Sequence, residues 1–252
     1  DLLRRIIDRN RAGQAIAIPS VCTAHPEALE ASLTLAEALD QPVVIEATSN
    51  QVNQDGGYTG LRPADFIRFV NEIATNAGVA HSRILFGGDH LGPQAWRKQP
   101  AEQAMDKAHR MVADYAAAGF SKIHLDCSEG CAGEPAQLPD HITAARSAAL
   151  AATALAAAPD PASLLFVIGT EVPPPGGART DDHGDIPPTT PQSAAATLAA
   201  HADAFRALNL PLDQIGGLVV QPGVEFSPME VHPLPLARDP GLLGALKDWP
   251  GL

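Results

Sequence analysis

The feature that most constrains the fold is a regular alternation of short apolar runs with longer amphipathic segments. Residues 15–18 form a short apolar run, and residues 27–39 follow with apolar side chains at helical spacing. Residues 43–45 and 63–77 repeat the same pair of patterns. Short apolar strands that alternate with helices are typical of a parallel sheet covered by helices. The sequence therefore predicts an α/β protein.

Six such strand and helix pairs can be counted along the chain. The expected strands are residues 15–18, 43–45, 84–86, 122–126, 164–170 and 218–220. The expected helices are residues 27–39, 63–77, 101–118, 140–158, 193–208 and 242–247. Pro63 is suited to the start of a helix and Gly119 to the end of one.

Polar residues follow nearly every expected strand. They are Ser20, Glu46, Asn50, Asp89, His90, Asp126, Ser128, Glu171 and Gln221. A doubly wound sheet gathers its polar chemistry at one switch point, whereas a TIM barrel spreads it over all the strand ends. We therefore expect a TIM (β/α)8 barrel, of which this chain supplies about six βα units. Residues 1–252 are expected to form one barrel domain that is incomplete at the C-terminal end.

Composition excludes several classes of function. The net charge of −12 disfavours nucleic acid and anionic membrane surfaces as partners. The longest nearly apolar stretch, residues 147–158, is too short to cross a bilayer, and residues 1–11 do not resemble a secretory signal. Three cysteines are typical of reduced thiols, so we expect a cytoplasmic protein. No nucleotide-binding glycine motif occurs, so no nucleotide cofactor is expected.

The sharpest local signal is the segment Gly-Gly-Asp-His-Leu-Gly-Pro at residues 87–93. Its glycines let the backbone approach a ligand, while Asp89 and His90 offer a proton acceptor and a metal ligand side by side. This pattern indicates metal-assisted or acid/base chemistry. The alternative is an Asp89 that caps a helix and a His90 that packs at the rim of the barrel.

Further carboxylates and one histidine end other strands. His124 and Asp126 are two residues apart on an expected strand, so both should face the pocket. A buried ion pair or hydrogen bond would explain His124 equally well, whereas Asp126, nearer the end of the strand, has the better claim to a site role. Glu171 and Glu46 would need a partner if buried, such as a divalent metal or a sugar hydroxyl. Capping a helix or bracing a loop is the alternative for both glutamates.

Three other candidates have more ordinary explanations. Cys127 and Cys131 are too far apart for the usual zinc-binding pair, so free thiols are expected. Lys122 opens the fourth strand, which predicts a position on the rim opposite the active face and argues against a Schiff-base lysine. Acidic residues within 181–185 are expected to be solvated.

Five segments taken together resemble one known family. They are residues 19–26, 46–54, 87–93, 122–133 and 169–177. In this order they are similar to the accessory-subunit family of class II tagatose-1,6-bisphosphate aldolase, the GatZ/KbaZ type. The resemblance implies a TIM barrel related to the zinc-dependent class II aldolases. It also implies a non-catalytic subunit that stabilises and activates a separate catalytic aldolase subunit in the catabolism of ketohexoses such as tagatose.

The resemblance also suggests roles for individual residues. Asp89 corresponds to a carboxylate that works in proton transfer, and His90 to a zinc ligand. Glu171 stands where the aldolase pattern has a further histidine, which makes it a candidate metal ligand and catalytic residue. Asp126 is the third catalytic candidate. The expected substrate-binding residues are Ser20, Glu46, Asn50, Ser128 and Gln221.

Three functions remain open from the sequence. The leading one is the accessory aldolase subunit, whose partners would be the catalytic class II subunit and a ketohexose or its phosphate. The second is a metal-dependent ketohexose 4-epimerase that interconverts tagatose and fructose, with zinc as the first choice of metal. The third is a sugar-phosphate-binding protein without turnover. Some relatives carry the label tagatose 6-phosphate kinase, which the missing nucleotide motifs do not support.

Overall fold

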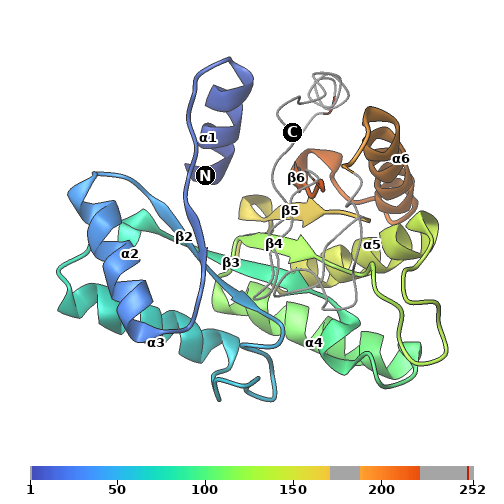
Figure 1. The fold of residues 1–252 in the computed structure, drawn as a ribbon, viewed down its shortest axis with the longest axis horizontal. Helices are drawn as coiled ribbons and strands as arrows, with labels where there is room; N and C mark the ends of the chain where they lie inside the picture. Colours follow the sequence, from blue (N-terminus) through green and yellow to red (C-terminus); the bar gives the residue numbers. More distant parts are fainter. Residues whose placement is uncertain (1, 171–187, 222–248, 250–252) are drawn as a thin grey trace.

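Six parallel strands form one sheet in which every strand pairs with its neighbours in sequence (Figure 1). The computed structural model describes residues 2–170, 188–221 and 249. The strands are β1 (Ser20–Cys22), β2 (Val43–Thr48), β3 (Ile84–Leu91), β4 (Lys122–Leu125), β5 (Leu165–Ile168) and β6 (Ile215–Leu218). This unbroken β1 to β6 order is that of a (β/α) barrel, whereas a doubly wound sheet reverses its order at a switch point. Within the described residues, the sheet is not closed between β1 and β6.

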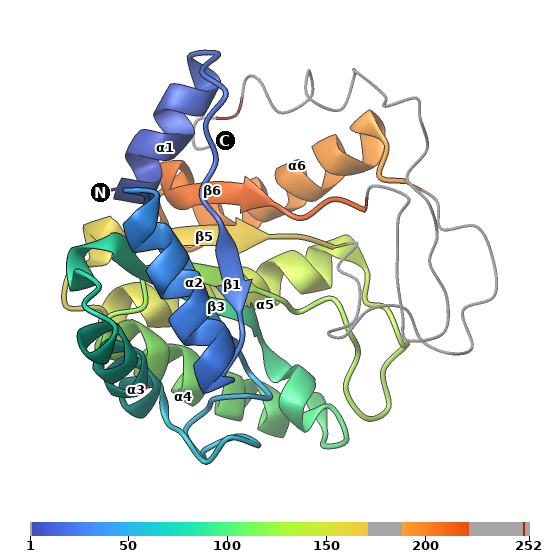
Figure 2. The ribbon, with the colours of Figure 1, turned by 60° about the vertical axis from the view of Figure 1, so that its left-hand side comes forward.

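Helices follow the strands and pack against one another around the sheet (Figure 2). They are α1 (Leu2–Arg11), α2 (Pro26–Ala38), α3 (Pro63–Asn76), α4 (Ala101–Ala118), α5 (Asp140–Ala157) and α6 (Pro191–Ala207), with short 3-10 turns η1 (His81–Arg83), η2 (Pro93–Trp96), η3 (Pro161–Ser163) and η4 (Leu212–Gln214). Each crossover from one parallel strand to the next passes through one of these helices. None of the described helices combines the length and the apolar character that a bilayer span requires.

The helix α4 illustrates how local sequence produces the observed elements. Its buried side chains, among them Ala104, Ala108 and Met111, recur every three or four residues and form one apolar face. The helix ends at Gly119, which has a φ of 108° and so adopts the left-handed conformation that glycine accepts without strain. The sequence predicted both the span and the end of this helix.

An aromatic cluster forms the core between α3, α4 and the strands. The rings of Phe66 and Phe120 lie 6.3 Å apart, and those of Tyr115 and Phe120 lie 4.5 Å apart. All three side chains are almost fully buried, and the hydroxyl of Tyr115 donates to the carbonyl of Val52 at 2.9 Å. Burial of each ring contributes roughly 2–3 kcal/mol. The cluster thereby fixes α4 under β2 and β3, of which β3 carries part of the polar site.

The first strand is the clearest error of the sequence prediction. Residues 15–18 were expected as the strand, but β1 begins at Ser20 and pairs Ser20 with Val44. The first backbone bond to β2 joins the amide of Val44 to the carbonyl of Pro19 at 2.9 Å. Strand pairing depends on which residues run alongside a neighbour, and an isolated apolar run does not reveal that. Ser20 is therefore part of a strand and does not follow one.

Other boundaries shift by a few residues. The fifth and sixth strands are shorter or earlier than expected, and β3 is longer. Leu39, the last residue of the helix expected over 27–39, lies just beyond the end of α2 and is 56% exposed. The expected helix over 242–247 lies outside the described residues. An additional helix, α1, was not predicted. Its Arg4 guanidinium donates to the carbonyl of Asp213 at 3.1 Å, which places α1 beside η4 and the beginning of β6.

Candidate functional site

A bulge in β3 brings Asp89 and His90 to the same side of the sheet. Gly88 pairs with Ile123 and Leu91 with Leu125, so Asp89 and His90 together oppose the single residue His124. Neighbouring residues of a regular strand point to opposite faces, and a bulge re-aims them. His90 has a φ of 49°, a left-handed conformation that costs a non-glycine residue energy. This local strain accompanies the side-by-side placement of the two functional groups.

The first contact of the site joins Asp89 to His124. The Oδ1 atom of Asp89 lies 3.0 Å from Nδ1 of His124, and the backbone nitrogen of His90 lies 3.2 Å from the same Nδ1 atom. Without a proton, Nδ1 accepts from the backbone N–H of His90, whereas with a proton it donates to Asp89 and the other bond is lost. In the second case the Nε2 atom of His124 is the basic nitrogen of the ring, and this buried atom has no hydrogen-bond partner among the described residues.

A second carboxylate holds His90. The Oδ2 atom of Asp126 lies 2.9 Å from Nδ1 of His90, while Oδ1 accepts from both the hydroxyl and the backbone N–H of Ser128, at 2.8 and 3.1 Å. Both oxygens of Asp126 are therefore occupied. The sequence predicted Asp126 as a catalytic residue and Ser128 as a substrate-binding residue, and both roles stay predictions. In the structure, Asp126 contacts the His90 ring and Ser128 contacts Asp126.

The pKa shifts follow from burial and from these pairings. Burial by itself would raise the pKa of Asp89, but the hydrogen bond from His124 and the nearby charges of His90, His124 and Lys122 lower it well below its usual range. Burial would lower the pKa of His90, yet the hydrogen bond to Asp126 and the charge of Asp89 raise it. Asp89 is consequently an ionised carboxylate at neutral pH.

The arrangement fits a divalent metal. Asp89, His90 and His124 each offer one ligand atom, and the three atoms lie within 4.8 Å of one another. In a carboxylate–histidine–metal arrangement, one ring nitrogen donates to a carboxylate and the other faces the metal. His90 and His124 both have the carboxylate partner, and the orphaned Nε2 atom of His124 is the kind of buried polar atom that a metal would satisfy. Imidazole and carboxylate donors suit zinc among other divalent metals.

A second polar group lies one layer of side chains below this cluster. The Oε1 atom of Glu46 is 2.5 Å from Nζ of Lys122 and also accepts from the hydroxyl of Ser20. The missing side chain of Gly87 provides the space that Glu46 occupies, because a Cβ atom there would lie 2.9 Å from Cγ of Glu46. Lys122 was expected at the opposite rim because it opens its strand, and it does open β4, but the contact with Glu46 was not predicted. Its long side chain reaches the Glu46 carboxylate on the inner face.

The remaining predicted residues are more dispersed. Asn50 donates through Nδ2 to Oε1 of Gln94 at 3.0 Å, a residue that the sequence analysis did not consider. The backbone of Gln221 exchanges two hydrogen bonds with Thr189, both of 2.7 Å. Glu171, predicted as a metal ligand and catalytic residue, lies outside the described residues, as do residues 181–185. The cluster is therefore defined by β3, β4 and the residues that follow β4.

The cysteines behave as predicted, with one addition. Cys22, Cys127 and Cys131 are free thiols. Burial, followed by the charge of Asp126, raises the pKa of Cys127 to about 12. Cys22 is exposed as a residue, but its thiol lies near Asp89 and Glu46. Partial burial of the thiol and then the two negative charges raise its pKa to about 12. Both thiols are therefore protonated at neutral pH.

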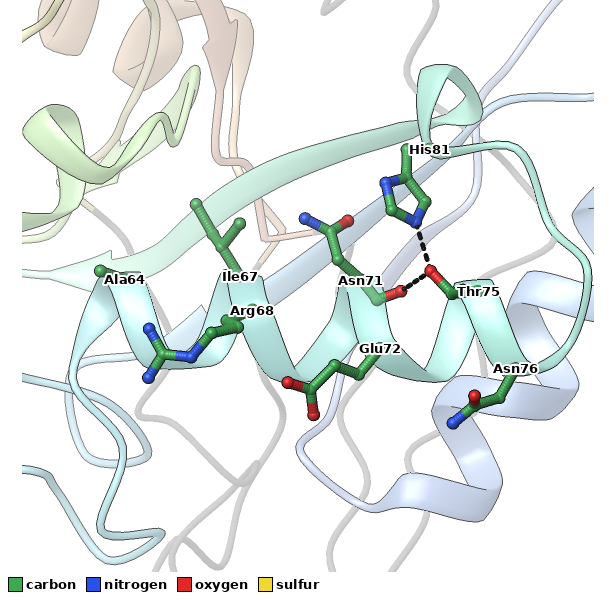
Figure 3. A pocket seen from close by; sticks show the side chains of 8 residues that line it. All are labelled: Ala64, Ile67, Arg68, Asn71, Glu72, Thr75, Asn76 and His81. Atoms are coloured by element: carbon green, nitrogen blue, oxygen red, sulfur yellow. Dashed lines mark hydrogen bonds between the residues drawn. The ribbon is translucent and has the colours of Figure 1, made fainter.

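One groove of the described structure lies away from this cluster. It has a volume of about 590 Å³ and runs along α3 as far as His81, whose Nε2 atom lies 3.0 Å from the hydroxyl of Thr75 (Figure 3). Its lining residues come from α3 and η1 and include no residue of a strand. The groove is therefore an outer-surface feature.

The fold and the cluster define a class of protein first. Consecutive parallel strands with carboxylates and imidazoles at their carboxyl ends are the arrangement of (β/α)-barrel proteins. The solved fructose-bisphosphate aldolase (Fba) of Campylobacter jejuni has this fold. It superimposes with a TM-score of 0.53 at 17% identity, over 88% of this chain and 57% of that one. At this identity the likeness concerns the fold alone.

Sequence comparison identifies the family within that class. The chain belongs to the D-tagatose-1,6-bisphosphate aldolase subunit GatZ/KbaZ-like family, which matches residues 3–252. The D-tagatose-1,6-bisphosphate aldolase subunit GatZ of Salmonella dublin is 45% identical over 98% of this chain and 58% of its own length. The D-tagatose 6-phosphate 4-epimerase of Agrobacterium fabrum is 48% identical over 89% of this chain and 54% of its own.

A solved structure supports the same assignment. A probable tagatose 6 phosphate kinase from Sinorhizobium meliloti 1021 superimposes with a TM-score of 0.83 at 45% identity, over 94% of this chain and 57% of that one. The chain thus spans a little over half the length of the relatives it matches. The family and the fold predicted from the sequence are both confirmed.

Proposed function

We propose that this chain supplies the barrel of an accessory subunit that stabilises and activates a catalytic class II tagatose-1,6-bisphosphate aldolase. The observation that carries this proposal is the 45% identity to a GatZ subunit over 98% of the chain. The expected partners are the catalytic aldolase subunit and a ketohexose or ketohexose phosphate. No role as a kinase is proposed, because the sequence contains no phosphate-binding glycine motif of a nucleotide site.

The direct test is reconstitution. The protein is mixed with the catalytic aldolase subunit, and complex formation is followed by size-exclusion chromatography together with the aldolase activity of the mixture. We expect a joint elution peak and a higher activity than that of the catalytic subunit alone. Separate peaks with unchanged activity would reject the accessory role.

A second function, a metal-dependent ketohexose 4-epimerase, is favoured by the intact polar cluster. A subunit that only supports another polypeptide has no need for two carboxylate-oriented histidines with a strained backbone at His90. The A. fabrum relative named D-tagatose 6-phosphate 4-epimerase, at 48% identity, also supports an epimerase function. The two functions are compatible with a single barrel.

In this second proposal the residues have separate roles. His90 and His124, with Glu171 as a further candidate, would hold the metal, which would polarise a carbonyl or hydroxyl of the ketose. Asp89 is the ionised carboxylate that accepts and returns a proton on the sugar. Asp126 and Ser128 keep the His90 ring in position, and Asn50 and Gln221 stay candidates for contacts with the sugar hydroxyls.

Metal analysis combined with a conversion assay tests the epimerase proposal. The purified protein is examined for bound zinc and incubated with D-tagatose 6-phosphate, and the sugar phosphates are separated afterwards. We expect the protein to contain zinc and to convert D-tagatose 6-phosphate into D-fructose 6-phosphate. Removal of the zinc by a chelator should abolish this turnover. Binding of the sugar without conversion, in the presence of added divalent metal, would leave a sugar-phosphate-binding protein and reject the epimerase.

A further inference from the structure

Lys122 is the one lysine or arginine in the six described strands, and it lies on the face that carries the polar cluster. In the sheet, Glu46 pairs with Gly87, and Gly87 pairs with Lys122. The Glu46 and Lys122 side chains meet at 2.5 Å across the space above Gly87. This ion pair therefore ties β2 to β4 across the intervening β3.

The position of Lys122 relates it directly to the cluster. It precedes His124 by two residues on β4, and Gly87 precedes Asp89 by two residues on β3. Side chains two residues apart on a strand point to the same face and stand roughly 6.6 Å apart along it. The lysine therefore lies one layer below Asp89 and His124.

The ammonium group of Lys122 has unused hydrogen-bonding capacity. It carries three donors, and among the described residues it contacts one acceptor, Oε1 of Glu46. Its side chain is 19% exposed, so most of the side chain is removed from bulk water. A largely buried cation with unused donors is unfavourable unless water or a ligand oxygen accepts from it. Glu46, which also accepts from Ser20, holds the ammonium in place.

We propose that Lys122 is a substrate-binding residue that donates to a hydroxyl or carbonyl oxygen of an open-chain ketohexose, with Glu46 and Ser20 as positioning residues. This inference rests on the proposed binding of a ketohexose or its phosphate at the cluster. The target is a sugar oxygen and not a phosphate, because barrels often bind phosphate in loops beyond the strand ends, whereas Lys122 starts at the opposite end of its strand.

The test is calorimetric titration with D-tagatose and with D-tagatose 6-phosphate. Lys122→Met removes the charge and keeps a similar length, and Lys98→Met is the matched control at an exposed lysine. We expect Lys122→Met to weaken the binding of both sugars about tenfold to a hundredfold, and Lys98→Met to leave it unchanged. Circular dichroism and thermal unfolding report whether each variant is folded.

The outcomes separate this inference from the function on which it rests. Weaker binding of the 6-phosphate alone, or equal binding by Lys122→Met and the unaltered protein, would overturn the role of Lys122 and leave the proposed function standing. Failure of the unaltered protein to bind either sugar would overturn this inference together with the proposed binding of a ketohexose at the cluster, whereas the accessory role is decided by reconstitution.

A measurement on the unaltered protein covers the case in which Lys122→Met does not fold. Reductive methylation followed by mass spectrometry reports the labelling rate of each lysine with and without saturating D-tagatose 6-phosphate. We expect the bound sugar to slow the labelling of Lys122 at least several-fold and to leave Lys98 unchanged. Equal labelling of Lys122 in both conditions, under saturating sugar, would contradict the proposal.

Discussion

The Nδ1 atom of His124 on β4 lies 3.0 Å from the Oδ1 atom of Asp89 in the bulge of β3. This contact and the 2.9 Å contact between His90 and Asp126 cross between the same two strands. The rings of His90 and His124 lie 4.7 Å apart, and each ring is oriented by a carboxylate through Nδ1. Two adjacent strand ends therefore form one unit that can hold a metal and move a proton.

Replacement of Asp89 tests the proton-transfer role. Asp89→Ala removes the ionised carboxylate, so we expect epimerase turnover to fall by at least about a hundredfold. The thermal unfolding midpoint should fall moderately, because the buried His124 loses its carboxylate partner, and circular dichroism reports whether the variant is folded. Asp106→Ala, at an exposed aspartate of α4, is the matched control. Retained turnover in Asp89→Ala would relocate the chemistry to another residue.

Replacement of Asp126 tests whether the protein orients His90 for metal binding. Asp126→Asn removes the charge that holds Nδ1 of His90 while keeping the shape of the side chain. We expect zinc affinity, measured by competition with a chromophoric chelator, to fall about tenfold to a hundredfold. Asp106→Asn should leave it unchanged. An unaltered zinc affinity in Asp126→Asn would show that this pairing does not serve metal binding.

The close approach of Gly92 to Asp126, the residue that follows β4, predicts a large loss of stability when Gly92 is replaced. A Cβ atom at Gly92 would lie 1.7 Å from the carbonyl oxygen of Asp126, a contact with backbone that cannot move aside easily. We expect Gly92→Ala to lower the free energy of unfolding by about 2–3 kcal/mol or more. Gly87→Ala should cost less, since its Cβ would meet the flexible side chain of Glu46. Urea denaturation measures both, and a smaller loss for Gly92→Ala would contradict this geometry.

The pairing of Glu134 with Arg146 predicts a pH-dependent contribution to stability. The two guanidinium nitrogens donate to Glu134 at 2.6 and 3.1 Å, and the backbone N–H of Cys131 donates at 2.9 Å. The hydrogen bond from Arg146 is the main reason that the pKa of Glu134 lies below its ordinary value of 4.5. Its contribution is therefore fully present above pH 4.5 and is lost as the pH falls through the lower folded-state pKa.

Glu134→Gln should lower the free energy of unfolding by about 1 kcal/mol at pH 7, since the pair is partly exposed. The difference from the unaltered protein should shrink at pH 3, where the unaltered protein has lost part of the same contribution. Glu30→Gln, at an exposed glutamate of α2, is the control. Equal differences at pH 7 and pH 3 would show that the carboxylate is not held by Arg146.

Sequence alone predicted the order of the elements well because helical periodicity and βα alternation are local properties. The spans of α3, α4 and α5 deviate by at most one residue from the expected ranges. The first strand was misplaced because strand limits depend on pairing with a neighbour, which is a non-local property. In the same way, the reach of Lys122 to Glu46 could not be read from its place at the start of a strand.

The candidate site was predicted in part for the same reason. Asp89, His90, His124 and Asp126 were all recognised, because parallel strands bring their carboxyl ends together. The contacts between these four side chains were not predicted, because they depend on a bulge and on which carboxylate oxygen faces which ring nitrogen. The bulge has a faint signal in the Gly-Gly pair at residues 87–88 before Asp89.

The accessory role is tested most directly by the thermal inactivation of the catalytic aldolase subunit. Its half-life at a temperature that inactivates it within minutes is measured with and without an equimolar amount of this protein. We expect the half-life to lengthen several-fold in the presence of the protein. Both polypeptides are used well above micromolar concentration, so that a complex with a micromolar dissociation constant would form. An unchanged half-life under these conditions would contradict the accessory role.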